Sequence, residues 1–247
     1  MSDNKTIISQ LYNGDCTETM RHFADKSIDC IITDPPYNLG LFMHKRNTNL
    51  KKMRENQFAY AGWDNLEFEE WETNIRNWLY ECSRVLKKKG TLVVFMAVIK
   101  VADVIRLATD AGFYYKTTGI WHKTNPMPRN MKIQFVNSTE CWIYFINQGT
   151  SGTFHNHDRV CHDFIESSVC PLSEKKEGKH PTQKPLSIMR TLIETLTNQD
   201  DVVLDPFMGS GSTCVAAKQL GRRYLGIELN KEYFKIAKAR IDNTTIL

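Results

Sequence analysis

The sequence contains no long hydrophobic run. No apolar stretch among its 247 residues approaches the roughly 20 residues that a membrane-spanning helix needs. Residues 1–10 also lack the basic start and the apolar core of a signal peptide, and the chain has no internal repeat or low-complexity tract. These absences disfavour a membrane protein or an exported protein and favour a cytoplasmic one.

Signs of disulfide bonds, of a bound metal and of strong charge are equally scarce. The seven cysteines are odd in number and follow no repeating spacing, which favours reduced thiols. A formal net charge of +4 permits a polyanionic partner but does not require one. Histidines and cysteines do gather in one polar stretch, at His155, His157, Cys161, His162 and Cys170. Their spacing matches no standard zinc pattern, so we predict no metal site.

The chain does contain a regular alternation of strand-like and helical patterns. Strands are expected at residues 7–11, 28–33, 91–95, 113–122, 139–147, 202–205 and 223–228, and helices at 16–23, 66–86, 101–111, 186–196, 214–220 and 231–241. The lysines and glycine at 87–90 are expected to end the second helix, because cations and glycine are favoured at helix C-termini. Such alternation is typical of a doubly wound α/β sheet.

The run 28–33 is continuously apolar and β-branched, as in a buried parallel strand, and it stops at Asp34-Pro35-Pro36-Tyr37. Two prolines fix the backbone and cannot donate to a sheet ladder, so they make a stiff turn. The turn presents a carboxylate, a carbonyl and an aromatic ring at the carboxyl end of a strand, where open α/β sheets bind ligands. An exocyclic amine on a flat base suits these groups. An ordinary strand-ending turn is the alternative, because Asp and Pro are common there.

A second motif lies near the end of the chain. Residues 202–228 read as a strand, a glycine-rich turn, a helix and a second strand that ends in Glu228. Glycines let a ligand approach the backbone, and an acid about 20 residues further on binds ribose hydroxyls. The turn is not the dinucleotide pattern, because Cys214 fills the third glycine position, and it lacks the Gly-Lys-Ser/Thr of a P-loop. We therefore predict a nucleoside-cofactor site.

Three segments together resemble the β class of S-adenosylmethionine-dependent DNA amino-methyltransferases. They are Asp-Pro-Pro-Tyr at 34–37, His-Pro-Thr-Gln-Lys-Pro at 180–185 and Asp-Pro-Phe-Met-Gly-Ser-Gly-Ser-Thr at 205–213. The resemblance covers residues 14–239, with the catalytic motif before the cofactor motif. It implies a single catalytic domain over 1–247 with a circularly permuted Rossmann-like methyltransferase fold, whose mixed, mostly parallel, seven-stranded sheet has helices on both faces. Strands 202–205, 224–228 and 7–11 would be the first, second and third of the unpermuted fold.

The resemblance also implies roles for individual residues. Asp34 would accept a hydrogen bond from the target amine, Pro35 would offer its carbonyl, and Tyr37 would stack on the extruded base. Pro36 completes the catalytic motif. Glu228 would bind the ribose hydroxyls of S-adenosylmethionine. The other cofactor contacts that the motifs imply are Asp15 at the adenine amino group, Thr182, Gln183 and Lys184 near the methionine end, and Asp205, Phe207, Gly209, Gly211 and Ser212 in the glycine turn. Lys184 is a candidate for the methionine carboxylate, and a solvent-facing lysine is the alternative.

Target recognition is expected outside the shared motifs, in a basic and aromatic loop at 41–62 and an insertion at 129–178. A solvated loop explains the charges of the first segment equally well. The candidate DNA contacts are Lys45, Arg46, Lys51, Lys52, Arg54 and Arg129. The expected partners are double- or single-stranded DNA, a second copy of the chain, as β-class relatives are often dimers, and a restriction endonuclease that acts on the same site.

The sequence favours adenine N6 as the methylated atom, because family members with Asp at the first motif position usually modify adenine. Cytosine N4 is the nearest alternative. A glutamine methyltransferase with Asn-Pro-Pro-Tyr is disfavoured by Asp34 and by the permuted order. A nucleic-acid-binding module that has lost catalysis predicts a damaged motif, whereas all three motifs are intact. A nicotinamide dehydrogenase is disfavoured by the turn pattern.

Overall fold

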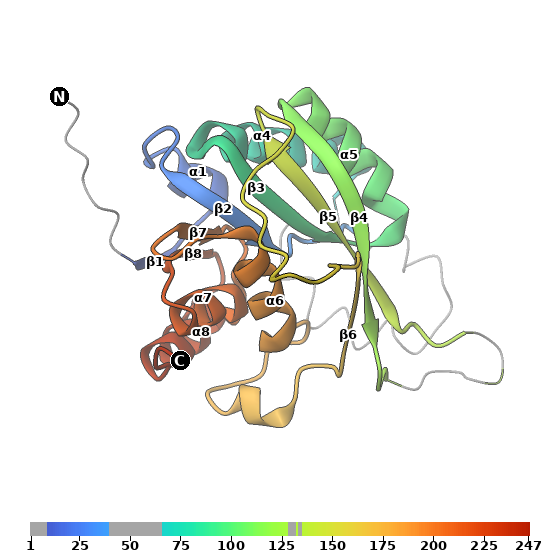
Figure 1. Cartoon of the computed structure of the whole chain (residues 1–247), viewed down its shortest axis with the longest axis vertical. Coiled ribbons are helices and arrows are strands. Elements are labelled where there is room, and N and C mark those ends of the chain that lie inside the picture. The colour runs from blue at the N-terminus through green and yellow to red at the C-terminus, as the bar shows by residue number, and fades with distance from the viewer. Residues whose placement is uncertain (1–8, 40–65, 128–131, 133–134) are drawn as a thin grey trace.

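A computed structural model describes residues 9–39, 66–127, 132 and 135–247 of the chain. An eight-stranded sheet forms the centre of the fold (Figure 1). In sheet order the strands are β1 (Gln10–Asn13), β8 (Arg223–Glu228), β7 (Val202–Asp205), β2 (Ile28–Thr33), β3 (Leu86–Met96), β5 (Thr139–Asn147), β4 (Phe113–Lys123) and β6 (Phe164–Ser167). All neighbours are parallel except that β5 is antiparallel to both β3 and β4. The predicted mixed, mostly parallel sheet is confirmed.

The predicted number of seven strands was wrong, because β6 adds an eighth at the edge beside β4. This strand has four residues whose side chains alternate between exposed and half-buried. It therefore lacks the continuous apolar run that reveals a buried strand. Strand β6 and strand β5 both lie within the segment 129–178, so part of this predicted insertion belongs to the sheet.

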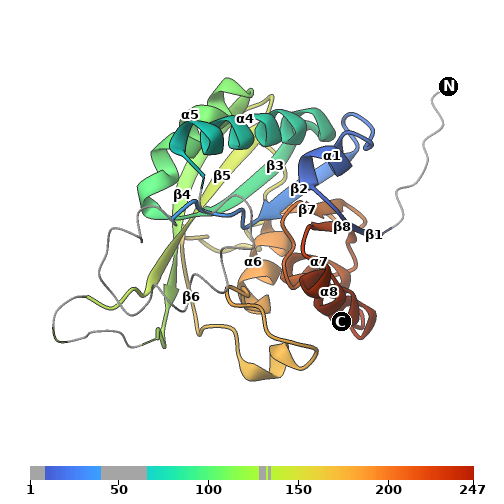
Figure 2. The ribbon, with the colours of Figure 1, turned by 180° about the vertical axis from the view of Figure 1, so that it is seen from behind.

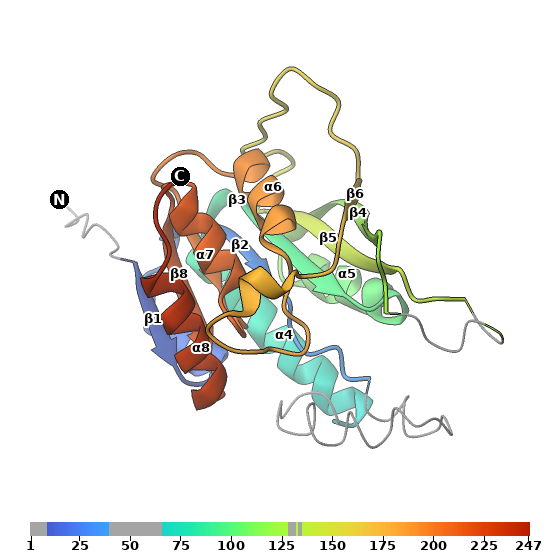
Figure 3. The same cartoon turned by 90° about the horizontal axis from the view of Figure 1, so that it is seen from below.

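Helices cover both faces of the sheet (Figures 1 and 2). One face carries α1 (Cys16–Met20), α4 (Phe68–Val85) and α5 (Val101–Asp110), and the other carries α6 (Leu186–Leu196), α7 (Ser212–Gln219) and α8 (Lys231–Asp242), which lie in front of the sheet in Figure 3. Ile31 packs with Trp71 and Trp78 in the first core, whereas Ile32 packs with Leu192 in the second. Burial on both faces explains why these strands are continuously apolar. Short 3₁₀ turns occupy Val98–Lys100 and Leu172–Lys175.

The helix that begins near Leu66 does not continue into the lysine run. It ends at Val85, and β3 begins at the next residue, so residues 87–90 are strand and the prediction of a helix end there was wrong. The backbone of Ser27 donates to the Val85 carbonyl at 2.9 Å, and the Lys87 ammonium pairs with Asp29 on β2 at 2.6 Å. Pairing with β2 thus overrides the local preference of the sequence.

The order β1–β8–β7 confirms the predicted third, second and first strands of the permuted fold. Strand β1 begins at Gln10, and residues 7 and 8 of the predicted strand lie outside the described residues. From β7 the chain crosses to β8 on one side, and from β2 it crosses to β3 on the other side. The carboxyl ends of β7 and β2 therefore meet at the topological switch point, where open α/β sheets bind ligands. None of the helices in the described parts of the chain has the length and apolarity that a membrane crossing requires.

Candidate active site

Two predicted motifs meet at the switch point. The Thr33 hydroxyl at the end of β2 donates to Asp205 Oδ1 at the end of β7 over 2.7 Å, and the Phe207 amide donates to the same oxygen at 3.2 Å. Asp205 is 4% exposed, and this burial, with a smaller contribution from the Asp34 charge, raises its pKa to about 6. The Phe207 ring packs edge-on against Trp78, with ring centroids 5.4 Å apart.

The Asp34 carboxylate has a donor on each oxygen. The Tyr37 hydroxyl donates to Oδ1 at 2.5 Å, and the Lys184 ammonium donates to Oδ2. Pro35 is buried and Pro36 is half-buried, so the stiff turn is anchored against the core. Burial raises the pKa of Asp34, although Lys184 opposes this rise. A carboxylate has about four acceptor positions, so these two bonds leave room for a further donor.

Lys184 is neither solvent-facing nor free. It is 6% exposed, and its ammonium also lies 3.2 Å from Glu140 Oε2. The Lys123 ammonium lies 2.5 Å from the other oxygen, Glu140 Oε1. Our sequence analysis missed Lys123 and Glu140, although Glu140 is an isolated charge in the otherwise apolar run 139–147, which is a signal that could have identified it.

The glycine turn faces the acid at the end of β8. The Gly209 amide donates to Glu228 Oε2 at 3.0 Å, and the Asn230 amide donates to Oε1 at 2.7 Å. Burial raises the pKa of Glu228 to about 7. Gly209 has a φ of +52°, and a Cβ there would lie 3.0 Å from His180 Nε2, so both conformation and space require glycine.

The rest of the turn is fixed from helix α8 and from the 180–185 segment. Gly211 has a φ of +78°, and a Cβ there would lie 3.1 Å from Ala237 Cβ. The Ser212 hydroxyl donates to the Lys184 carbonyl at 2.8 Å. The Arg240 guanidinium, which is 5% exposed on α8, donates to the Ser210 carbonyl at 2.5 Å. Arg240 is another residue that the sequence analysis missed, because its position on a helix face is ordinary for a surface arginine.

The remaining predicted cofactor residues surround this turn. Asp15 follows β1 and caps α1, accepting from the Glu18 amide at 2.9 Å. Thr182 is exposed, with its hydroxyl 3.4 Å from His180 Nδ1. Gln183 is 7% exposed and donates to the Glu174 carbonyl at 2.8 Å, while its Oε1 has no hydrogen-bond partner in the structure as described.

His180 lies between the turn and helix α8. Its ring meets the Tyr233 ring edge-on, with centroids 4.3 Å apart. Burial, with the positive charges of Lys184, Arg240 and Lys175, lowers the pKa of His180 to about 4, so the imidazole is neutral at physiological pH. A neutral ring beside Gly209 adds bulk and hydrogen-bonding capacity without repelling a cation.

The predicted DNA contacts lie outside the described residues. All six DNA-contact candidates, Lys45, Arg46, Lys51, Lys52, Arg54 and Arg129, fall in segments 40–65 and 128–131, which the structure does not describe. Among the described residues no group of histidine, cysteine or carboxylate side chains can hold a metal ion.

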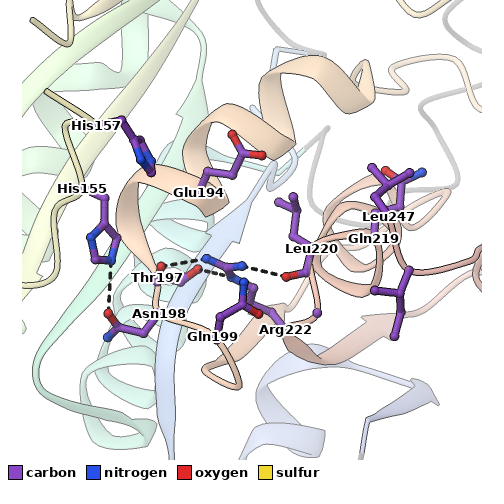
Figure 4. Close-up of a pocket in the computed structure, with 12 residues that line it drawn as sticks. His155, His157, Glu194, Thr197, Asn198, Gln199, Gln219, Leu220, Arg222 and Leu247 are labelled. Atoms are coloured by element: carbon purple, nitrogen blue, oxygen red, sulfur yellow. Dashed lines mark hydrogen bonds between the residues drawn. The ribbon is translucent and has the colours of Figure 1, made fainter. Parts of the chain in front are cut away.

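A cavity of about 600 Å³ lies far from these motifs, among His155, Glu194, Arg222 and Leu247 (Figure 4). Its walls include the residues that precede β7 and β8, so it sits at the opposite edge of the sheet from Asp34. The Arg222 guanidinium donates to the Thr197 hydroxyl, the Thr197 carbonyl and the Leu220 carbonyl, so its donors already serve the fold. We assign this cavity no part in the chemistry.

The switch-point residues fit a nucleoside cofactor with an amino-acid tail. The Glu228 carboxylate accepts from the Gly209 and Asn230 amides, and a carboxylate has about four acceptor positions, so it can also accept from a ribose diol. The buried Gln183 Oε1 has no hydrogen-bond partner among the described residues, and an α-ammonium group could donate to it. A glycine turn, a buried acid and an Asp-Pro-Pro-Tyr turn at adjoining strand ends define an S-adenosylmethionine-dependent methyltransferase.

Comparison with known proteins identifies the family. The family model described as DNA methylase, which unites N6 and N4 methyltransferases, matches residues 28–239. The chain belongs to this family, and it is a DNA methyltransferase that uses S-adenosylmethionine.

Three relatives illustrate the similarity. The chain is 32% identical over 253 residues to the type II methyltransferase M.HinfI of Haemophilus influenzae, covering 95% of this chain and 68% of that protein. It is 33% identical over 242 residues to the type II methyltransferase M2.LlaDCHI of Lactococcus lactis subsp. cremoris, covering 94% and 88%. The crystal structure of the M1.HpyAVI complex with S-adenosylmethionine has a TM-score of 0.73 and 29% identity, covering 94% of this chain and 98% of that one.

Proposed function

We propose that this methyltransferase modifies the N6 amine of adenine in DNA and serves as the modification component of a restriction–modification system. The observation that carries the proposal is the Asp34 carboxylate, which is held by Tyr37 and Lys184 beside the glycine turn. An acceptor at this place can bind an exocyclic amine, and Asp at this motif position is usual for adenine enzymes. The type II methyltransferases to which the chain is similar support the restriction–modification assignment.

The chain's own groups would position the target base. The amine donates to Asp34 and to the Pro35 carbonyl, which draws the nitrogen lone pair out of conjugation with the ring. The Tyr37 ring stacks on the base, and its hydroxyl bond to Asp34 keeps ring and carboxylate together. Because an amine inside a duplex cannot be reached, a duplex substrate requires base extrusion. Pro36 keeps this turn stiff.

Cofactor binding would use the residues around the glycine turn. S-adenosylmethionine, when bound, supplies an electrophilic methyl group on a sulfonium centre. Glu228 holds the ribose hydroxyls and Asp15 the adenine amino group, while Gln183 Oε1 accepts from the α-ammonium group. The remaining proposed contacts around the cofactor are Thr182, Asp205, Phe207, Gly209, Gly211 and Ser212. The two ion pairs of Lys184 inside the protein favour a different role for that residue, at the Asp34 carboxylate.

Most of the catalysis would then be positioning, because residues that hold the amine and the cofactor together would turn a bimolecular reaction into a unimolecular step. An ordinary carboxylate is too weak a base to deprotonate an arylamine, so the proton leaves after the methyl group has been transferred. Asp34 therefore serves as a hydrogen-bond acceptor, and its ionised form is the active one.

The proposal extends to recognition and partners. We place DNA contacts in the segments 41–62 and 129–178, and a homodimer and a cognate endonuclease complete the proposed system, which works in the compartment that holds the DNA. Cytosine N4 is the second candidate target, because the matched family unites enzymes of both kinds.

Nucleoside mass spectrometry tests the proposal. Unmodified duplex and single-stranded DNA is incubated with the protein and S-adenosylmethionine, then digested and analysed. We expect N6-methyladenine, whereas N4-methylcytosine would keep the mechanism and overturn the adenine assignment.

The Asp34→Ala variant tests the division of labour between the motifs. We expect it to lose at least a hundredfold in methyl transfer while it still binds S-adenosylmethionine in calorimetry. A folded variant that has lost cofactor affinity contradicts the proposed role of Asp34.

A further inference from the structure

Four charged side chains form a largely buried row beside the Asp-Pro-Pro-Tyr turn, in which Lys184 is buried and the other three are partly buried. Asp34 follows β2, Lys184 precedes α6, Glu140 lies on β5 and Lys123 lies on β4. Lys184 bonds Asp34 Oδ2 and lies 3.2 Å from Glu140 Oε2, and Lys123 lies 2.5 Å from Glu140 Oε1. The signs alternate, so the row as a whole is electrically neutral.

The burial of this row separates it from an ordinary surface ion pair. The side chains of Lys184 and Lys123 are 7% and 15% exposed, and those of Asp34 and Glu140 are 21% and 24% exposed. By comparison, the surface pair of Lys235 and Glu232 is more than two-thirds exposed on both sides. Charges with so little access to water stay ionised only if neighbours compensate them. The Lys184 ammonium also lies 5.1 Å from the centre of the Phe95 ring, an apolar wall on the inner side.

Lys184 and Glu140 act on the pKa of Asp34 in opposite directions. Burial raises the pKa of Asp34, Lys184 lowers it, and Glu140 raises it. For Glu140, the positive charges of Lys184 and Lys123 outweigh burial and bring its pKa below the ordinary value. The pKa of Lys184 is held above its ordinary value, because Asp34 and Glu140 together outweigh burial.

Other titratable groups also face this carboxylate. The Tyr37 hydroxyl donates to it, and its own pKa is raised well above the ordinary value by burial. The Asp34 charge contributes to the raised pKa of Asp205 on β7, and the Lys184 charge contributes to the lowered pKa of His180. Neither has a hydrogen bond to Asp34, so within the described part of the chain Lys184 is the cation that reaches the carboxylate.

We propose that Lys184 and Glu140 are positioning residues for methyl transfer. Lys184 occupies Oδ2 of Asp34 and keeps the carboxylate ionised, so the amine can use the second acceptor position of Oδ1, beside the Tyr37 hydroxyl. Glu140 anchors the ammonium and limits how strongly it withdraws charge from the carboxylate. This inference rests on the proposed function, in which Asp34 accepts the target amine. Lys123 is the last residue of the row, and its positive charge compensates the negative charge of Glu140.

The test is the pH profile of single-turnover methylation under saturating S-adenosylmethionine. Methyl-labelled cofactor and unmethylated plasmid DNA serve as probes, from about pH 5.5 to about pH 9. Asp34 must be ionised to accept the amine, so the rate falls on the acid side. We expect Lys184→Met to move this acid limb to higher pH and to lower the plateau at least tenfold. Glu140→Gln should move the limb to lower pH, and Lys184→Arg should bring it back towards the wild-type position.

Lys87→Met is the matched control. Lys87 pairs with Asp29 over 2.6 Å at the opposite end of β2, with its side chain 47% exposed, so its loss removes a Lys–Asp pair without touching Asp34. We expect an unchanged pH profile. Cofactor binding, measured by calorimetry for every variant, shows that each one is folded.

The outcomes separate this inference from the proposed function. Reduced rates of Lys184→Met and Glu140→Gln with the acid limb at its wild-type position would mean a merely structural row and overturn the inference. If Lys184→Met does not fold, the same reading applies to Glu140→Gln and Lys184→Arg. An active Asp34→Ala variant would instead refute the proposed function itself.

Discussion

The affinity for S-adenosylmethionine should rise with pH through the titration of Glu228. Burial raises the pKa of this carboxyl to about 7, from an ordinary value near 4.5. At that value about a quarter of Glu228 is ionised at pH 6.5 and about nine-tenths at pH 8. The proposed ribose contact needs the ionised acceptor. We therefore expect S-adenosylmethionine to bind about fourfold more tightly at pH 8 than at about pH 6.5, which corresponds to about 0.8 kcal/mol of binding free energy.

Isothermal titration calorimetry measures this change and offers a second readout. Binding that selects ionised Glu228 releases a fraction of a proton near pH 7, and this release appears as a dependence of the heat on the buffer's ionisation enthalpy. The Glu228→Gln variant is the control, because it retains the titration of the cofactor itself and loses that of the carboxyl. Asp205 has a pKa of about 6, below the range from about pH 6.5 to about pH 8, so its titration contributes little to the change in cofactor affinity. Equal pH dependence in wild type and variant would refute the reasoning.

Two further predictions concern the turn and its neighbouring acid. Gly209→Ala should weaken cofactor binding at least tenfold and destabilise the fold by about 1–2 kcal/mol, because Gly209 has a φ of +52° and a Cβ would meet His180 at 3.0 Å. Gly112→Ala is the control for backbone strain without crowding, because Gly112 has a φ of +91° and its added Cβ would have its nearest atom at 3.9 Å. Equal cofactor affinities in both variants would exclude crowding as the cause. Asp205→Asn should raise the free energy of unfolding at pH 8 by about 3 kcal/mol, since the folded-state pKa of about 6 lies above the ordinary 3.8. Between about pH 4 and about pH 6 the folded wild type keeps the Asp205 proton that the unfolded chain has lost, so the stability of the wild type falls as pH rises through this range. The greater stability of the variant in urea denaturation should therefore vanish below about pH 4. A stability difference that is independent of pH would contradict this account.

The sequence predicted the elements that its own periodicity determines. The strand at 139–147 and the helix at 186–196 have the predicted bounds, because each is an unbroken apolar or 3.6-residue pattern. Pairing partners are not written in such patterns. The lysine run at 87–90 reads as a helix end until it is placed beside β2, where Lys87 meets Asp29 and the helix has already stopped at Val85.

The candidate site shows the same division. Asp34, Gly209 and Glu228 were predictable because each belongs to a local motif with its own chemistry. Lys123 belongs to no such motif, and Glu140 is marked only as an isolated charge in an apolar run. Both reach Asp34 only through Lys184, across segments distant in sequence. Lys184 itself was identified as a site residue from its motif, but its partner could be known only once β2 and the segment before α6 were adjacent.

Negative charge is concentrated where the cofactor would bind. The Asp34 charge contributes to the raised pKa of Asp205, and the Asp205 charge contributes to that of Glu228, so the three carboxyls lie within electrostatic reach of one another. Close to them, Lys184 is paired with Asp34 and Glu140, and His180 is neutral. Such a site attracts a cation and resists ionising fully without one. A sulfonium cofactor supplies that positive charge, whereas the thioether left after methyl transfer is neutral. We therefore expect Asp205 and Glu228 to favour the cationic cofactor over its neutral product, whereas the Asp34 charge is already paired with Lys184.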